Sequence, residues 1–297
     1  MKRLAPFVSA VTTAMLALPA FAADGSPEMM GFRWGKNAFN FEGMPSGPQP
    51  LRNLSRLPNG KANAGRLVGD YHNPILTPEA AAVVKQKGEL AIAGVGFRNA
   101  QDQCRPIAPP FTFAMQLGFV MLPTKTGIDI VYDQNANIRH IRMNGAHPVK
   151  LVPSTMGDSV GHWEGDTLVV DTVGVKVDTF TSVDRFGTPQ SDKMHTIERY
   201  RLIDGAQAKA QIDKYETSEG TVGGGGRDAG YNPDTSLKGL QLEVTMQDPK
   251  IFTGPLSARV TYRRVITDWQ ESVCADNPME HYKDEWIGLP RTDRRDF

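Results

Sequence analysis

The stretch LQLEVTMQ, Leu240 to Gln247, alternates apolar and polar side chains without a break. Leu240, Leu242, Val244 and Met246 fall on one face of an extended chain, and the polar residues fall on the other. Since successive side chains of a strand point to opposite faces, a period of two is typical of an antiparallel strand with one buried face. The stretch therefore predicts a half-buried strand of a β domain.

Other segments share this strand character. They are GIDIVYD (127–133), NIRHIRM (137–143), DTLVVDTV (166–173), HTIERYRLI (195–203), KAQIDKYE (209–216) and ARVTYRRVI (258–266). The sequence DQNAN (133–137) joins the first two as a hairpin turn would. About seven or eight short strands linked by turns indicate a mainly β protein, an antiparallel meander that closes into a calycin-like barrel or folds into a sandwich. We expect the barrel.

One short N-terminal helix is predicted in LTPEAAAVVKQKG (76–88). Thr77 is a suitable N-cap, Pro78 suits the first helical position, and Gly88 is expected to end the helix. The preceding residues 23–73, rich in Gly, Pro, Asn and Ser, read as an extended arm. We therefore expect a single β domain over 74–275, with a Gly-rich insertion loop at 217–238 and a polar C-terminal tail at 276–297.

Residues 1–22 have the pattern of a secretory signal peptide. Lys2 and Arg3 precede an uncharged stretch that ends in Ala20-Phe21-Ala22. Without these residues the formal charge changes from 0 to −2, which argues against nucleic acid as the main partner. No second apolar run would hold the mature chain in a membrane, so we expect a periplasmic or secreted protein. Its oligomeric state does not follow from the sequence.

The two cysteines, Cys104 and Cys274, are an even pair in an exported chain. An oxidising compartment favours a Cys104–Cys274 disulfide, with two separate thiols as the alternative. A metal site is not expected, because neither cysteine has a second Cys or a His at ligand spacing. No cofactor motif is present, and GGGGRDAG (223–230) lacks the Lys-Ser/Thr of a phosphate loop.

The stretch GHWEGDTLVVDT, Gly161 to Thr172, has two interpretations. As a tight hairpin turn at Gly165, it leaves Glu164 in solvent and packs Trp163 on a strand. As an uninterrupted strand, it places His162, Glu164 and Asp166 together as a polar rim above an apolar interior. The turn is favoured, and the three polar residues stay candidates for a site beside it.

Two further histidines are candidate site residues. His147 lies in the loop sequence NGAHP, where functional residues are common. His195, in HTIER, is three residues from Glu198, so in a strand the two point to opposite faces and do not form a dyad. His195 reads as a partly buried His or a base, and Glu198 and Arg199 as cross-strand charge partners.

The stretch SVGHWEGDTLVVDT, with FGTPQSDKMHTIERYR and VTMQDPKIFTGPL after it, resembles a set of exported bacterial proteins of unknown function. They share the pattern G-x-W-E-G-D-T-L-V-V-D-T, and the resemblance covers roughly residues 138–255. It implies an exported β protein and carries no chemistry. The chain departs from the pattern at the Gly-rich insertion and at VCADN (273–277).

Two main classes of function remain open. One is an exported protein that binds a small, largely apolar ligand in its barrel. The other is a simple acid–base enzyme, a hydrolase, lyase or isomerase, with His147, His162 or His195 as base and Glu164 or Asp166 as partner. Polar side chains deep in a cavity would favour the enzyme. An envelope protein that interacts through its arm and Gly-rich loop is a third, weaker alternative.

Overall fold

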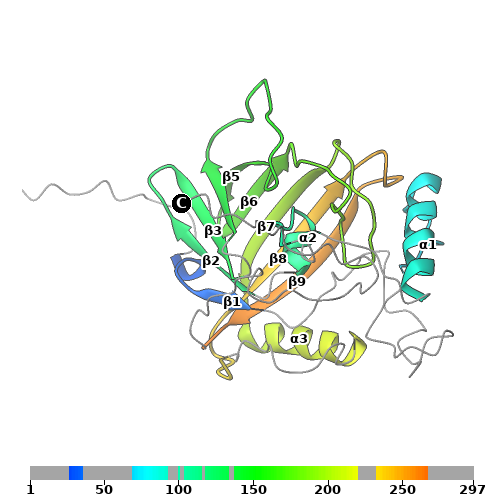
Figure 1. The fold of residues 1–297 in the computed structure, drawn as a ribbon. Helices are drawn as coiled ribbons and strands as arrows, with labels where there is room; N and C mark the ends of the chain where they lie inside the picture. Colours follow the sequence, from blue (N-terminus) through cyan, green and yellow to red (C-terminus); the bar gives the residue numbers. More distant parts are fainter. Residues whose placement is uncertain are drawn as a thin grey trace, which may run out of the picture.

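The computed structural model describes residues 27–35, 69–92, 100, 104–115, 118–133, 137–219 and 232–266. Nine strands close into one barrel in which neighbours in the chain are neighbours in the sheet, and β1 pairs with β9 (Figure 1). The strands are β1 Arg33–Gly35, β2 Gly118–Pro123, β3 Gly127–Tyr132, β4 Ile138–Met143, β5 Asp158–Glu164, β6 Thr167–Val173, β7 His195–Ile203, β8 Gly239–Gln247 and β9 Leu256–Arg264. The predicted mainly β barrel is confirmed, and the sandwich is excluded.

One pair of strands departs from the predicted antiparallel meander. β4 and β5 run parallel, with Ile141 opposite Ser159 and Met143 opposite Gly161. A parallel neighbour cannot follow a two-residue turn. Residues 144–157 therefore form a long connection that returns the chain to the start of β5, and this connection carries His147.

The predicted N-terminal arm needs correction at residues 33–35. These residues form β1, which pairs with both β2 and β9 and so closes the barrel. Trp34 is fully buried, and its indole Nε1 donates to the Met29 carbonyl at 3.0 Å. Burial of this large side chain outweighs the loop-like composition around it.

Three α-helices flank the barrel, and a short 3-10 helix, Pro27–Met29, precedes it. The predicted helix is α1 Pro78–Ile92, capped by Thr77, whose Oγ1 accepts from the Ala80 amide at 3.2 Å. It continues past Gly88, which is buried and does not end it. Within the described ranges no helix has the length and hydropathy that a membrane span requires.

The predicted strand at 209–216 is wrong, because this segment belongs to helix α3 Gly205–Glu219. Asp204 caps the helix by accepting from the amides of Ala206 and Gln207 at 2.9 and 3.0 Å. The ideal Cβ position at Gly239 of β8 lies 2.3 Å from the Ala208 Cβ, so only a glycine lets α3 approach the sheet this closely.

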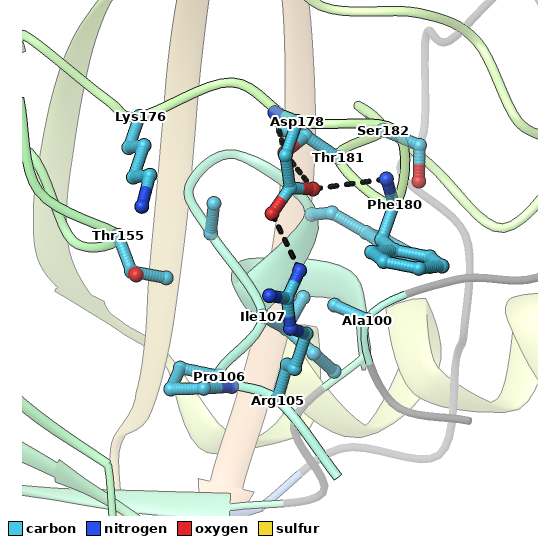
Figure 2. Close-up of a pocket in the computed structure, with 12 residues that line it drawn as sticks. Ala100, Arg105, Pro106, Ile107, Thr155, Lys176, Asp178, Phe180, Thr181 and Ser182 are labelled. Carbon is cyan, nitrogen blue, oxygen red and sulfur yellow. Dashed lines mark hydrogen bonds and ion pairs between the residues drawn. The ribbon is translucent and has the colours of Figure 1, made fainter. Parts of the chain in front are cut away.

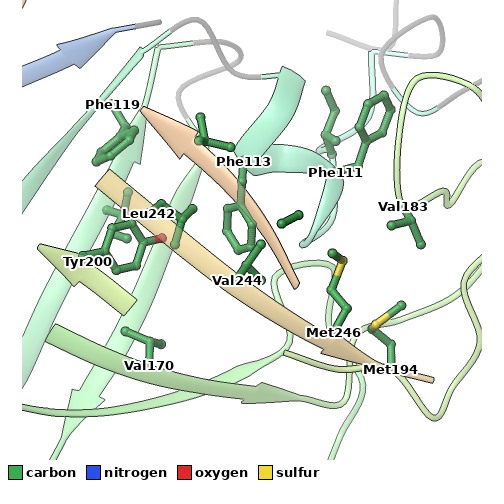
Figure 3. Packing of buried hydrophobic residues seen from close by; sticks show 14 of the residues in the cluster. Phe111, Phe113, Phe119, Val170, Val183, Met194, Tyr200, Leu242, Val244 and Met246 are labelled. Carbon is green, nitrogen blue, oxygen red and sulfur yellow. The ribbon is translucent and has the colours of Figure 1, made fainter. Parts of the chain in front are cut away.

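Aromatic side chains fill the barrel interior. The Phe119 ring meets the Tyr262 ring edge-on at 5.0 Å and the Tyr132 ring at 6.0 Å. Helix α2 Phe111–Met115 adds Phe113, whose ring extends from α2 into this buried cluster (Figure 3). The buried face of β8 predicted from LQLEVTMQ belongs to this cluster, since Leu240, Leu242, Val244 and Met246 are fully buried.

Several predicted features fall outside the described residues. They are the signal peptide (1–22), most of the N-terminal arm, residues 220–231 of the Gly-rich insertion, Cys274 and the tail at 276–297. The Cys104–Cys274 disulfide therefore stays a prediction.

Candidate functional site

The WEGD segment forms a hairpin turn, as the favoured interpretation predicts. β5 and β6 are antiparallel, Glu164 pairs with Thr167, and Gly165 has φ = +58°. A glycine at the first of two turn positions is typical of a type II′ hairpin. Trp163 packs against the core, whereas Glu164 and Asp166 are exposed.

Two of the three rim candidates meet on the outer face of the barrel. His162 Nε2 lies 3.2 Å from Glu164 Oε1, and Arg199 Nη2 donates to Glu164 Oε2 at 2.5 Å. The hydrogen bonds from Arg199 and then from His162 hold the pKa of Glu164 below its ordinary value. Asp166 is in the turn, and none of its interactions is among those described. The group is solvated, as a surface ion pair is, and forms no rim above the interior.

His147 and His195 do come together, through a carboxylate that the sequence analysis did not single out. Nε2 of His195 lies 2.8 Å from Asp171 Oδ1, and Nε2 of His147 lies 3.1 Å from the same oxygen. Nδ1 of His147 lies 2.6 Å from Asp158 Oδ1. Arg142 donates to both oxygens of Asp158, at 2.7 and 2.8 Å. We call these five residues the histidine–aspartate chain.

Hydrogen bonds within the histidine–aspartate chain shift the pKa values of Asp158 and Arg142. Partial burial raises the pKa of Asp158, but the hydrogen bonds from Arg142 and His147 outweigh it and hold the pKa below its ordinary value. The hydrogen bond to Asp158 raises the pKa of Arg142. Nδ1 of His147 faces Asp158 and Nε2 faces Asp171, so both ring nitrogens are already in contact with a carboxylate oxygen. His147 therefore has no ring nitrogen left to act as a base.

His195 differs from His147 in this respect. Its Nε2 faces Asp171, and no described contact uses its Nδ1. Its side chain is 33% exposed, on the outer face of β7. An imidazole that a carboxylate orients through one nitrogen, and whose second nitrogen has no described contact, can exchange protons with a bound molecule. Among the described residues, no group of three or more His, Cys, Asp or Glu side chains could hold a metal ion.

The barrel interior contains a buried ion pair. Arg139 of β4 donates to both oxygens of Glu198 of β7, at 2.7 and 2.6 Å, and the two side chains are 1% and 0% exposed. Thr172, Thr196 and Tyr200 also donate to this carboxylate. These contacts satisfy the carboxylate, so the pair reads as a structural element of the core.

Glu198 and Arg199 are charge partners across strands, as predicted, but their partners lie on strands that are not direct neighbours of β7. Glu198 faces the interior and pairs with Arg139, and Arg199 faces outward and pairs with Glu164. The alternation of side chains along β4 and β7 indicates that Arg139 and Glu198 face the interior. Arg139 falls on the same face as Ile141, and Glu198 falls on the same face as Tyr200.

A pocket of about 120 Å³ lies between two loops, and its residues lay outside all sequence predictions (Figure 2). We call it the loop pocket. Its lining is Ala100, Arg105, Pro106, Ile107, Ala108, Phe111, Thr155, Lys176, Asp178, Phe180, Thr181 and Ser182. Most of the lining comes from two loops, one that precedes and enters α2 and one that follows β6, and Thr155 comes from the β4–β5 connection. Loops carry no hydrophobic period, so nothing in the sequence pairs these two segments.

One wall of the loop pocket is held by hydrogen bonds. Arg105 Nη1 donates to Asp178 Oδ2 at 2.8 Å, and its guanidinium lies 5.0 Å from the centre of the Phe180 ring. Asp178 Oδ1 accepts from the Phe180 amide at 2.9 Å and from the Thr181 hydroxyl at 3.2 Å. These contacts hold the wall in one conformation without a ligand.

The comparisons with known proteins add no relative. No family model, no curated protein and no solved structure matches this chain. The description of the site therefore rests on the geometry of this chain alone.

Proposed function

We propose that this protein binds a small molecule in the loop pocket, with an apolar body and an anionic or hydrogen-bond-accepting end. The single observation that carries the proposal is the cavity itself, which has apolar side chains on its walls and the Lys176 side chain at its border. A pocket with apolar walls and a cation at its border favours a ligand with an apolar body and an anionic or accepting end.

The apolar part of the lining supports the same ligand class. Ile107, Ala108 and Phe111 are almost completely buried and border the cavity. Small-molecule sites are usually lined mainly by apolar side chains, with a small number of polar groups that orient the ligand. Ligand carbons would replace water against these side chains, and the polar end would set the orientation.

Lys176 supports an anionic end. Its side chain borders the pocket opposite Phe180 (Figure 2), and no ion pair of Lys176 is among the described contacts. Asp178 is already neutralised by Arg105. The charge left for a ligand is therefore positive.

The volume limits the ligand. About 120 Å³ is well below the roughly 300–1,000 Å³ of pockets that enclose drug-sized molecules. The pocket suits a short molecule, or one end of a longer one. The barrel interior is a poorer host, because the aromatic cluster and the Arg139–Glu198 pair occupy it.

A titration with straight-chain C4–C8 carboxylates and the matched alcohols tests the proposal. Isothermal calorimetry on the wild-type protein should detect the carboxylates. Lys176→Gln should weaken carboxylate binding at least fivefold and leave the alcohols unchanged, and Thr155→Trp, which fills the pocket, should weaken both. Lys125→Gln, in the β2–β3 turn, is the matched control. Failure of every probe to bind, or equal binding by the pocket variants and the control, would contradict the proposal.

Acid–base catalysis by His195 and Asp171 is the second candidate function, favoured by the open Nδ1 of His195. Hydrolysis of 4-nitrophenyl butyrate, measured as a pH–rate profile, should then be abolished by His195→Gln. His140→Gln is the matched control, since His140 makes a similar exposed contact with Asp129 at 2.6 Å. Equal rates in the two variants, or none in the wild type, would exclude this candidate.

We also propose that the protein is exported, on the sequence pattern of residues 1–22. Intact mass after expression with the full leader should then correspond to a chain that starts at Ala23. Alkylation without reduction should leave both cysteines unmodified, since export favours the Cys104–Cys274 disulfide. A retained leader would contradict export, and two alkylated cysteines would contradict the disulfide.

A further inference from the structure

The connection between β4 and β5 is fixed at both ends. At its start the Asn144 amide donates to the Gly161 carbonyl at 2.7 Å, and His147 is held by Asp158 and Asp171. At its end Ser154 pairs with Val175 in a parallel bridge, and the Ser154 amide donates to the Gly174 carbonyl at 3.1 Å. Figure 1 shows this connection as the green segment that rises above the barrel.

Between these ends lies PVKLVP, residues 148–153, which we call the tip loop. Val149 and Val152 are 109% and 79% exposed, the highest values among the exposed large hydrophobic side chains of the described residues. Leu151, between them, is half-buried, and its side chain lies within 3.6–3.8 Å of the ideal Cβ position at Gly174. Pro148 and Pro153 restrict the backbone at the two ends.

The exposure of the two valines is therefore built into an anchored loop. A loop that folds one aliphatic side chain against the barrel and holds two others in water presents an apolar tip. Such a tip gains free energy when another apolar phase covers it.

The charges around the tip loop indicate which kind of surface it binds. Lys150 lies between the valines, is exposed, and has no described ion pair. Lys176 directly follows Val175, the residue that pairs with Ser154. The carboxylates on the adjoining segments, Asp158 and Asp178, already pair with arginines. The tip thus combines apolar side chains with positive charge that is not neutralised, which complements an anionic phospholipid surface.

We propose that the tip loop docks this protein on an anionic lipid surface. Val149 and Val152 enter the headgroup region, and the Lys150 ammonium contacts lipid phosphates. The tip adjoins the loop pocket through Thr155, so docking would place the pocket mouth near the lipid. Lys176 borders both features, but the docking is tested on Val149, Lys150 and Val152, so the two proposals fail separately.

Sedimentation with sucrose-loaded vesicles tests the docking. The full mature chain should bind vesicles of equal phosphatidylcholine and phosphatidylglycerol and should bind pure phosphatidylcholine less. High salt should lower the bound fraction, because the lysine contribution is screened. The double variant Val149→Ser/Val152→Ser and the single variant Lys150→Gln should each lower the bound fraction at least threefold.

Matched controls come from the same barrel. Ile138→Ser removes a side chain that is 60% exposed on β4, and Lys125→Gln removes a turn cation, so both should bind as the wild type does. Absence of wild-type binding, or equal binding by the tip variants and the controls, overturns the proposal. A wild-type dimer on size exclusion that becomes a monomer in the valine variant would also overturn it, because the tip would then cover a second copy of the chain.

Discussion

Replacement of Glu198 by leucine removes the partner of a buried cation. In the wild type, Arg139 and Glu198 are 1% and 0% exposed and share two hydrogen bonds of 2.6 and 2.7 Å. In Glu198→Leu the guanidinium keeps the Ser159 and Thr172 hydroxyls but has no counter-charge. Breaking such a pair from one side typically costs about 3–5 kcal/mol, a large fraction of the roughly 5–15 kcal/mol that stabilises a domain.

A double-mutant cycle separates the cost of an unpaired buried charge from the cost of changed packing. Arg139→Met/Glu198→Leu replaces both groups with apolar side chains of similar volume, and such replacements are often neutral or stabilising. We expect the double variant to recover most of the loss, with a coupling free energy of about 2 kcal/mol or more.

Urea unfolding followed by tryptophan fluorescence measures the wild type, Glu198→Leu, Arg139→Met and the double variant. In a separate thermal melt, the melting temperature of Glu198→Leu should fall by about 6–20 °C. A loss below about 1 kcal/mol in Glu198→Leu would mean that water reaches Arg139. A double variant as unstable as the sum of the singles would show that the pair does not act as a unit.

Three further predictions concern the core and the hairpin. Tyr132→Phe should be close to neutral, because the Tyr132 hydroxyl has no hydrogen-bond partner, whereas Tyr200→Phe should cost about 1.5–3 kcal/mol, because its hydroxyl donates to Glu198 at 2.9 Å; urea midpoints compare the two. Burial raises the pKa of Tyr132 from 10.0 to about 12, so its stabilisation should be complete below about pH 10 and lost as the pH rises to about 12. Unfolding at fixed urea and the difference in 295 nm absorbance between the wild type and Tyr132→Phe should follow that loss together, and an absorbance difference already half complete at pH 10 in the folded protein would contradict it. Gly165→Val should cost about 1–2 kcal/mol because of the positive φ, and Glu164→Gln should leave the melting temperature unchanged; a stable Gly165→Val protein would contradict the turn.

Alternation in the sequence was sufficient to predict the barrel. β3, β4, β6, β7, β8 and β9 lie where the period of two indicates them, since one face of each strand is buried against a common interior. β1 and β2 were not predicted because Trp34 and Phe119 lie in short segments with few alternations, and β5 was implied only as one arm of the WEGD hairpin. The strand predicted at 209–216 was wrong because its apolar residues also fit a helical period, and Asp204 with Gln207 three residues later is a helix-start signal.

The candidate site was predicted only in part. His147 and His195 meet because the return of the chain to β5 places a loop residue beside β6, and no local pattern reports the parallel β4–β5 pair that requires this return. The outward orientation of Asp171 could be predicted, because Val170 and Thr172 on either side of it face the interior. The loop pocket combines Arg105 with Lys176 and Ser182 from distant segments, and only the closed barrel brings them together.

The central claim is that a small ligand binds in the loop pocket and does not enter the barrel interior. Methyl-resolved NMR during titration with hexanoate tests this claim most directly. The claim predicts saturable chemical-shift changes at the methyl groups of Ile107 and Ala108, and none at Leu242 or Val244. Shifts confined to Leu242 and Val244, or no saturable shift at any of the four residues, would contradict it.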